Sequence, residues 1–488
     1  MSFLGLDIGT TSVKVFAFDE NWEILECSSR PLPIAYPSPG RAVQDPGNII
    51  QSSIDAMKDV AQRLPLPPVA IGIANQRETV TAWDRNTREP LAPAISWQDR
   101  RGELFCENLK RSGAEDFIRD TTGLTLDPYF SATKYSDLAS SLGKSLGTVA
   151  MGTLDTWILA NLTGSSESAT DFSNASRTSL FDIDSGNYLE SLASLFNVPL
   201  ELLPHVRASN SLFGEITHPY LTEWRGVPVH AILGDQQASL FGQGCTSYGD
   251  CKATLGTGTF ALTNIGDHKG SPVMGLVTSI AWNLTGKGST YCLEGSILSG
   301  AAMLDWLVSA MGIAESTEDL ESLALSVRSS EQVTLLPFFG GTGAPWWNEE
   351  SYAVLGGLDL STTKAHLVRA GFEAIALHLA EVTKTIKDHL AIDLKELRID
   401  GGLSNLDFLC QLISDHSQLS CNTSYHPDSA AFGAAMMAAL GVGALEFHDI
   451  GGLPRVRKRY EPSPNRTASK TRAGRWNRYL GKLGLPSQ

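Results

Sequence analysis

Two short turns rich in glycine and threonine, one in each half of the chain, constrain the fold more than any other feature. The first is Gly9-Thr10-Thr11-Ser12 and the second is Gly256-Thr257-Gly258-Thr259. Each turn lies between two runs whose residues favour extended backbone. These runs cover residues 3–8 and 13–18 around the first turn, and residues 251–255 and 260–263 around the second. A strand, turn and strand that occur twice indicate a duplicated fold.

The residues of the first turn suit an anion. Gly9 lets the backbone approach a bound group closely, because it has no side chain. Thr10, Thr11 and Ser12 offer hydroxyls and successive N–H donors, which together can form an anion-binding nest. An ordinary hairpin explains either turn alone. The pair favours two phosphate-binding turns that close on one nucleotide.

The length of the chain predicts two domains. At 488 residues it exceeds the size at which single hydrophobic cores stop growing. Hydrophobic residues make up 42% and charged residues 19%, which is typical of a globular protein. No low-complexity linker separates the halves, so we expect a hinge near residues 242–249. The predicted domains are residues 1–245 and residues 246–488.

The net charge and the cysteines indicate which binding partners and which cellular compartment to expect. A net charge of −15 argues against non-specific binding to nucleic acid or to an anionic membrane, and no membrane insertion is expected. The seven cysteines show no C-x-x-C spacing, and no signal peptide opens the sequence, so reduced thiols and a cytoplasmic location are expected. Residues 430–447 are rich in Ala and Gly and predict a buried helix capped by Asp428 or Ser429. The basic tail, residues 453–488, predicts a helix docked on the body, with a nucleic-acid arm as the alternative.

Strand-like and helical runs alternate along the chain, which is typical of α/β layers. The clearest strand candidates are residues 69–74, 227–233 and 397–400. The clearest helix candidates are residues 48–64, 300–311 and 364–390. Together with the two turns, this pattern predicts an α/β fold of two actin-like (ribonuclease H-like) domains with a nucleotide and substrate cleft between them.

Three acids stand at or just after the ends of predicted strands. Asp7 precedes the first turn, where a carboxylate can hold Mg²⁺ or its water shell against phosphate oxygens. Asp235 follows the run 227–233, and capping of the next helix is its ordinary alternative role. Asp400 precedes a Gly-Gly turn that lets a ligand approach the backbone. These positions suit acids that face a nucleotide.

A second group of residues suits a polyol. Asn75-Gln76-Arg77-Glu78-Thr79 follows one strand, and Trp97 lies about twenty residues further along. Hydroxyl groups need donors and acceptors, whereas the C–H face of a polyol packs on aromatic rings. Taken alone, Arg77 and Glu78 could equally form a solvated charge pair, and Trp97 could belong to the core.

Across nearly its whole length the sequence resembles the FGGY carbohydrate kinases, and among them most of all those that phosphorylate glycerol. The segments that carry the resemblance are residues 6–12, 75–79, 97–101, 122–131, 155–157, 174–178, 234–238, 256–258, 343–345 and 400–402. So many matches in the same order are specific for the family.

The resemblance implies a role for each matched residue. Arg77, Glu78, Tyr129, Asp235 and Gln236 would hold the polyol, with Asp235 as catalytic base. Trp97 and Phe260 would line the carbon side of the polyol. The residues implied for ATP are Thr10, Thr11, Ser12, Lys14, Thr257, Gly300, Gly401, Gly402 and Asn405, with Asp7 for Mg²⁺.

The implied activity is transfer of phosphate from ATP to glycerol, giving glycerol 3-phosphate. Another polyol or a ketose, such as erythritol, xylulose or ribulose, is the main alternative, and a non-catalytic sugar or nucleotide sensor is the second. Asn405 stands one position earlier than the Asn common in the family, and Asp305 replaces a common Gln. These departures leave nucleotide preference open. Association into a homo-oligomer is also expected.

Overall fold

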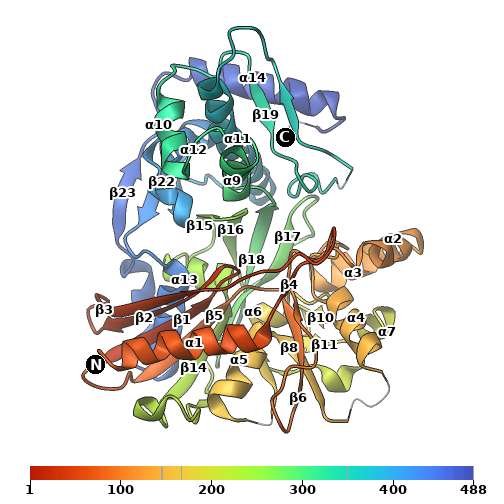
Figure 1. Cartoon of the computed structure of the whole chain (residues 1–488), viewed down its shortest axis with the longest axis vertical. Coiled ribbons are helices and arrows are strands. Elements are labelled where there is room, and N and C mark those ends of the chain that lie inside the picture. The colour runs from red at the N-terminus through yellow and green to blue at the C-terminus, as the bar shows by residue number, and fades with distance from the viewer. Residues whose placement is uncertain (144–146, 166, 349, 487–488) are drawn as a thin grey trace.

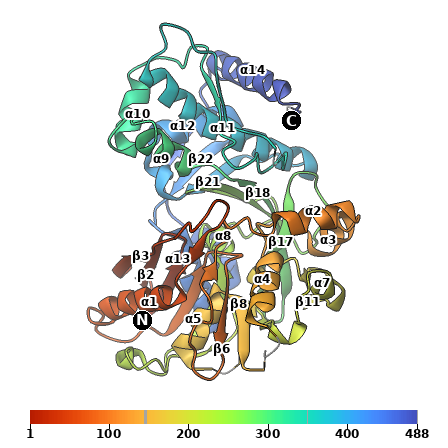
Figure 2. The same cartoon turned by 45° about the vertical axis from the view of Figure 1, so that its right-hand side comes forward.

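The computed structural model describes residues 1–143, 147–165, 167–348 and 350–486. The molecule has two lobes, each built around a mixed sheet with helices packed against it (Figure 1). The N-terminus lies in the lower lobe of that view and the C-terminus in the upper lobe. Figure 2 shows the same two lobes turned so that the right-hand side of Figure 1 comes forward.

The first sheet has six strands in the order β13-β14-β5-β1-β2-β3. β1, β2 and β3 form an antiparallel meander, whereas β5 is parallel to both β1 and β14. Its strands are β1 (Ser2–Ile8), β2 (Ser12–Asp19), β3 (Ile24–Pro31), β5 (Ala70–Asn75), β13 (Gly214–Glu215) and β14 (Pro228–Gly234). The first Gly-Thr turn joins β1 to β2, as predicted.

The second sheet repeats this plan in the order β17-β18-β16-β15-β21-β22-β23. β15, β16 and β18 are antiparallel, and β21 is parallel to β15 and β22. Its strands are β15 (Cys251–Leu255), β16 (Thr259–Gly266), β17 (Val277–Leu284), β18 (Gly288–Ile297), β21 (Glu396–Asp400), β22 (Ser420–Ser424) and β23 (Val456–Tyr460). The second turn joins β15 to β16, so the predicted duplication is confirmed.

Smaller sheets complete the strand inventory. In the first lobe a four-stranded sheet has the order β4-β7-β6-β8, and three strand pairs lie elsewhere. These strands are β4 (Val43–Gln44), β6 (Val80–Asp84), β7 (Ala94–Ile95), β8 (Val149–Thr153), β9 (Ala169–Asp171) with β12 (His205–Arg207), β10 (Phe181–Asp182) with β11 (Asn187–Tyr188), and β19 (Thr334–Leu336) with β20 (Val354–Gly356).

The helices that the sequence predicts are present. α1 (Pro46–Ala61) begins where the Asp45 side chain accepts a hydrogen bond from Gly47 N, with Pro46 in the first turn. α9 (Ala301–Ser309) is shorter than predicted, and α11 (Lys364–Leu390) has the predicted bounds. The other helices are α2 (Glu103–Arg111), α3 (Glu115–Thr122), α4 (Ala132–Leu142), α5 (Leu154–Thr163), α6 (Phe172–Ala175), α7 (Glu190–Leu195), α8 (Asp235–Gly242), α10 (Thr317–Leu325), α12 (Asp407–Ser417), α13 (Ser429–Gly441) and α14 (Thr467–Lys482).

The basic tail docks on the second lobe, as predicted. It forms the edge strand β23 and the helix α14, in which Trp476 and Leu480 are fully buried. Among the described residues, none of the helices combines the length and apolar character that crossing a membrane requires.

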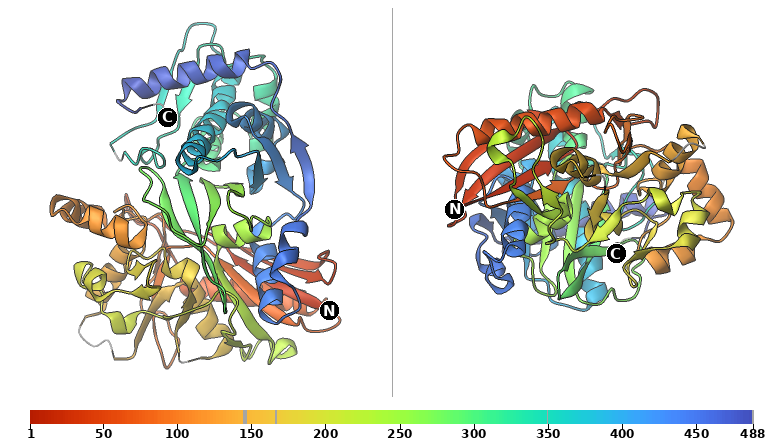
Figure 3. Two further views of the ribbon diagram at one scale, coloured as in Figure 1. Left: turned by 180° about the vertical axis from the view of Figure 1, so that it is seen from behind. Right: turned by 90° about the horizontal axis from the view of Figure 1, so that it is seen from below.

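Helix α13 belongs to the second half of the chain but packs on the first sheet. In Figure 3 it lies, in blue, beside the red strands β1 and β2. A Cβ atom on Gly5 would lie 1.9 Å from Ala431 O, and one on Gly72 would lie 1.9 Å from Ala434 O. Glycine on the sheet therefore lets the helix backbone approach closely. The helix ends at Gly441, earlier than the predicted residue 447, because Gly443 adopts a positive φ of 73°.

Helices α8 and α13 cross between the lobes at two further glycines. A Cβ on Gly242 would lie 2.1 Å from Ser429 O, and one on Gly433 would lie 1.9 Å from Ala238 O. α8 begins at an acid, Asp235, and α13 begins directly after one, Asp428. The crossing therefore packs the C-terminal turn of α8 against the N-terminal turn of α13.

Candidate active site

Two neighbouring cavities lie in the cleft, of about 160 Å³ and about 310 Å³. We call them the smaller and the larger cavity. Both halves of the chain line each of them. Three residues line both cavities, namely Asp235, Gln236 and Thr254. We call these three side chains the common wall. Groups bound in the two cavities can approach each other at this wall.

The smaller cavity brings together every residue that the sequence assigns to the polyol. These are Arg77, Glu78, Trp97, Tyr129, Asp235, Gln236 and Phe260. Thr10 and Thr257, one from each Gly-Thr turn, also line it. The two turns therefore face the same cavity from opposite lobes.

Three aromatic rings form one side of the smaller cavity. The Trp97 ring lies edge-on to Tyr129 at a centroid distance of 5.7 Å and to Phe260 at 6.3 Å. Trp97 Nε1 donates to Thr10 Oγ1 at 2.9 Å, which ties this wall to the first turn. Trp97 is half-buried: it packs against the hydrophobic core and also lines the smaller cavity.

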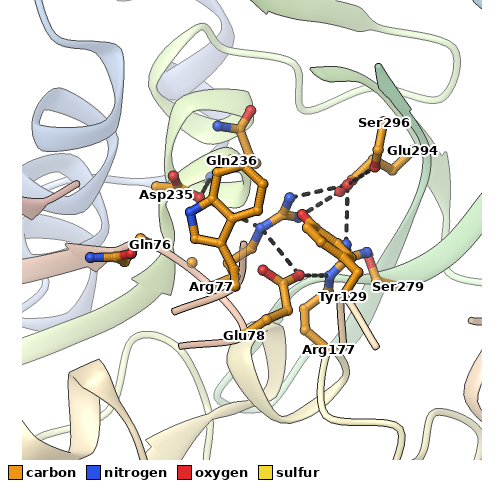
Figure 4. Close-up of polar contacts among 12 residues, drawn as sticks. Gln76, Arg77, Glu78, Tyr129, Arg177, Asp235, Gln236, Ser279, Glu294 and Ser296 are labelled. Atoms are coloured by element: carbon orange, nitrogen blue, oxygen red, sulfur yellow. Dashed lines mark hydrogen bonds and ion pairs between the residues drawn. The ribbon is translucent and has the colours of Figure 1, made fainter. Parts of the chain in front are cut away.

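Arg77 and Glu78 belong to a buried ionic network, not to a solvated pair (Figure 4). Arg77 Nη1 and Nη2 donate to the two oxygens of Glu294 at 2.5 and 3.0 Å. Arg177 Nε donates to Glu78 Oε1 at 2.6 Å, and its Nη2 donates to Glu294 Oε1 at 3.1 Å. Two cations and two anions thus compensate one another.

Glu294 connects the lobes, because it lies on β18 whereas both arginines belong to the first half of the chain. Burial alone would raise the pKa of this carboxyl, but Arg177 and Arg77 lower it to about 2. Ser296 Oγ adds a hydrogen bond of 2.7 Å. Sequence reasoning missed Glu294 as a site residue. Its available signal was a single acid within a buried strand.

Glu78 has a strained backbone, with a φ of 61° in the left-handed region that favours glycine. Its carbonyl oxygen accepts from Ser131 Oγ at 3.2 Å, and its carboxylate is held by Arg177. A strained residue persists where its surroundings fix it, and such residues cluster at functional sites. The Glu78 side chain lines the smaller cavity, with its Oε1 3.9 Å from Arg77 Nε.

Asp235 is the first residue of α8, whose N-cap is Gly234, so Asp235 is not the N-cap residue itself. Its Oδ1 accepts from Gln236 N at 2.7 Å and lies 3.5 Å from Arg77 Nε. Burial raises the pKa of Asp235, whereas Arg77 acts in the opposite direction. The side chain keeps 26% exposure, so a ligand can reach it.

The larger cavity has the electrostatics of a site for phosphate and a cation. The N-termini of α8 and α13 open onto it, and backbone N–H groups at helix N-termini attract anions. Lys14 Nζ lies 2.8 Å from Asp428 Oδ2 within the same cavity. The ion pair with Asp428 raises the pKa of Lys14. This lysine therefore stays charged beside any bound anion.

Asp7 fits a role as a Mg²⁺ ligand. Burial raises its pKa well above the usual range, and Asp428 adds to this effect. Within the described residues, its Oδ1 is buried and has no hydrogen-bond partner. No cluster of three or more His, Cys, Asp or Glu side chains in the described ranges could hold a metal ion alone. Mg²⁺ usually takes one or two carboxylates together with water and phosphate oxygens, which one free carboxylate oxygen matches.

The Gly-Gly turn after Asp400 fits only glycine at its first position. Gly401 has a φ of 86°, and a Cβ there would lie 2.5 Å from Leu255 O. Gly401, Gly402 and Asn405 all line the larger cavity, as the nucleotide assignment requires. Arg457, which the sequence did not indicate, lines it too and donates to Ser404 O at 2.8 Å.

Three predicted nucleotide residues lie outside both cavity walls, namely Thr11, Ser12 and Gly300. Thr11 O and Ser12 O accept backbone hydrogen bonds that shape the first turn. Gly300 N donates to Thr257 O at 2.9 Å, so Gly300 lies directly behind the second turn. Their roles in nucleotide binding stay predictions.

Comparison with known proteins matches this architecture. The model of the FGGY family of carbohydrate kinases, N-terminal domain, matches residues 2–242, and that of the C-terminal domain matches residues 251–442. A glycerol kinase from Pseudothermotoga lettingae is 40% identical over 468 residues, covering 94% of this chain and 93% of that protein. A glycerol kinase from Thermus brockianus is 39% identical over 467 residues, covering 94% of each.

Solved structures agree on the fold. The crystal structure of Plasmodium falciparum glycerol kinase with ADP superposes with a TM-score of 0.89 at 29% identity, covering 99% of this chain and 98% of that one. A ligand-bound xylulose kinase from Lactobacillus acidophilus gives 0.87 at 20% identity, covering 100% and 99%. At that lower identity the likeness concerns the fold alone.

A duplicated fold with two cavities that meet at one carboxylate defines a phosphotransferase of the sugar-kinase class. The chain belongs to the FGGY family of carbohydrate kinases, and the predicted two-domain fold and kinase class are confirmed.

Proposed function

We propose that this protein transfers the terminal phosphoryl group of ATP to glycerol, giving glycerol 3-phosphate, with Asp235 as the general base. One observation carries the proposal: Asp235 lies on the wall common to both cavities. A base in that position can hold the acceptor hydroxyl in the smaller cavity while the phosphate chain occupies the larger one. The glycerol kinases at 36–40% identity over most of the chain support glycerol as the acceptor.

The smaller cavity has the groups that a short polyol needs. Glu78 and Asp235 accept hydrogen bonds from hydroxyls, and Arg77 donates them. Burial raises the pKa of Tyr129, so its hydroxyl stays protonated. Trp97 and Phe260 offer apolar surface to the carbon chain. At about 160 Å³ the cavity favours a small acceptor.

In the proposed reaction, a polyol hydroxyl oxygen attacks the terminal phosphorus of ATP in line with the bond that breaks to ADP. A new O–P bond forms, the bond to the leaving oxygen breaks, and the hydroxyl proton passes to the Asp235 carboxylate. Lys14 and the N-termini of α8 and α13 favour the negative phosphate chain. Mg²⁺ held by Asp7 would neutralise charge on the phosphate oxygens.

A kinetic assay of ADP release tests the proposal. ATP and Mg²⁺ are supplied with glycerol, erythritol, xylulose, ribulose or gluconate, each in turn. The expected result is the highest kcat/KM with glycerol. A higher kcat/KM with another polyol or a ketose would retain the kinase chemistry and contradict the glycerol assignment. No acceptor-dependent ADP release would contradict catalysis and favour a sensor. Cytoplasmic location and self-association stay predictions.

A further inference from the structure

Lys252 is a buried cation next to the common wall, and the proposed reaction gives it no role. It lies on β15 and is fully buried. Its Nζ donates to Gln236 Oε1 at 2.6 Å and to Thr254 Oγ1 at 2.7 Å. These acceptors are two of the three residues that line both cavities. Lys252 therefore supports the wall from behind.

The chemistry of lysine fixes the direction of these hydrogen bonds. An ammonium group only donates, so Gln236 must turn its Oε1 toward Lys252. The two ends of a side-chain amide point apart, which leaves Nε2 of Gln236 for the cavities that this side chain lines. Figure 4 shows Gln236 beside Asp235 above the ionic network. The wall thus presents a hydrogen-bond donor next to the carboxylate.

Thr254 shows the same directional order. Its only hydroxyl proton goes to Asp400 Oδ1 at 2.5 Å, so its oxygen lone pair accepts from Lys252. Asp400 Oδ2 accepts from Ser239 Oγ at 2.6 Å. The chain from Lys252 through Thr254 to Asp400 and Ser239 joins β15, β21 and α8. Asp400 is therefore a structural acceptor in this chain.

The surrounding charges favour a cation at this position. Burial lowers the pKa of Lys252, and Asp400 and Asp235 oppose that effect. The same two acids contribute to raising the pKa of Asp7. A neutral residue in place of Lys252 would leave these acids with less compensation and would also release the Gln236 amide.

We propose that Lys252 is a positioning residue that holds the side-chain amide of Gln236 so that its Nε2 donates to a ligand oxygen where the polyol and the phosphate chain meet. The function of that donor rests on the proposed phosphoryl transfer. The contact between Lys252 and Gln236 does not depend on that reaction, so the contact and the reaction can be tested separately.

A double-mutant cycle in kinetics tests the positioning role. The proteins are wild type, Lys252→Met, Gln236→Met and the double variant. We expect Lys252→Met to lower kcat/KM for glycerol about tenfold or more in the wild-type background and by less than about threefold in the Gln236→Met background. Equal losses in both backgrounds would show that Lys252 acts only through the fold, which would overturn the proposal.

Urea unfolding of the same four proteins tests the contact without activity. The loss of stability caused by Lys252→Met should be larger when Gln236 is present. Lys134 is the matched control, since it is also fully buried and donates to the carbonyl oxygens of Pro128, Tyr129 and Phe130. Lys134→Met should destabilise both Gln236 backgrounds equally. Equal effects of Lys252→Met on both would overturn the contact. An inactive wild type would contradict the proposed function and leave the unfolding cycle to decide.

Discussion

At the residue scale, the proposed reaction depends on Asp235, a carboxylate whose pKa is raised by burial in the cleft. Burial raises the pKa of Asp235, because the charged form loses water without full compensation from Arg77. A group with a raised pKa is protonated over a wider range of low pH. It can accept a proton only above that pKa.

The pH dependence of turnover follows from this shift. As pH falls through the raised pKa of Asp235, the carboxylate becomes protonated and kcat should decrease. The measurement is kcat for ADP release with saturating glycerol across acidic and neutral pH. Constant kcat down to the ordinary Asp pKa of about 3.9 would contradict the base assignment.

Glu294 provides a second prediction at this scale. Its pKa of about 2 means that it stabilises the fold above its ordinary pKa and loses that contribution as pH falls toward 2. Glu294→Gln should therefore destabilise the protein at pH 7 by about 3 kcal/mol or more, because two buried guanidinium groups lose their anion. It should also raise KM for glycerol, since Arg77 loses its fixed position.

Urea unfolding at pH 7 and steady-state kinetics measure both effects. Glu190→Gln, at an exposed position at the start of α7, is the control and should change neither. An unchanged KM in Glu294→Gln would show that the network does not position the polyol residues.

The residue scale also shows what the sequence could predict. The polyol residues lie in short motifs with ordered matches, so their grouping in one cavity was predictable. Glu294 and Lys252 were not, because each acts through a contact with a residue distant in sequence, 217 positions away for Arg77 and 16 for Gln236. Hydrophobic patterning marks such residues only as polar positions inside strands.

At the element scale, α13 joins the second half of the chain to the first sheet through backbone-close contacts. Gly5 and Gly72 of the first sheet face Ala431 and Ala434 of this helix. Periodicity predicted α11 to the residue, because apolar residues recur at spacings of three and four along its whole length. It extended α13 too far, because an Ala-rich run does not show where a helix ends. It also gave no indication that this helix covers the first sheet.

Gly72→Ala tests the packing of α13. The new Cβ would lie 1.9 Å from Ala434 O, so sheet and helix must separate, and we expect destabilisation of about 1–3 kcal/mol. Gly474→Ala in α14 is the matched control, because no atom lies within 4 Å of its Cβ position. That change should leave stability equal or slightly higher, since Ala favours helix. Equal unfolding midpoints for Gly72→Ala and wild type would contradict the close packing.

At the scale of the whole molecule, the two halves repeat one topology but share their interiors. The two turns made the duplication predictable. The contacts between the halves were not predictable. Helix α13 of the second half packs on the first sheet, and Glu294 of the second half accepts hydrogen bonds from Arg77 and Arg177 of the first. We propose that the domain boundary near residue 245 is a boundary of sequence, not of independent folding.

Production of the halves separately checks this proposal. Residues 1–245 alone should lack cooperative unfolding, because the face of the first sheet that α13 covers would be exposed. Production together with residues 246–488 should restore a cooperative transition. The measurement is unfolding in urea, monitored by circular dichroism. A cooperative transition for residues 1–245 alone would contradict the shared core.

We propose above all that Asp235 accepts the proton of an acceptor hydroxyl bound in the smaller cavity, beside the wall common to both cavities. Asp235→Asn keeps the shape of the side chain and removes the base. The most direct test compares ADP release by this variant and wild type with glycerol, together with binding of ATP and glycerol by calorimetry. We expect this variant to bind both ligands as wild type does and to lose turnover by about 10²–10⁴-fold or more. Turnover like that of wild type would contradict this role of Asp235.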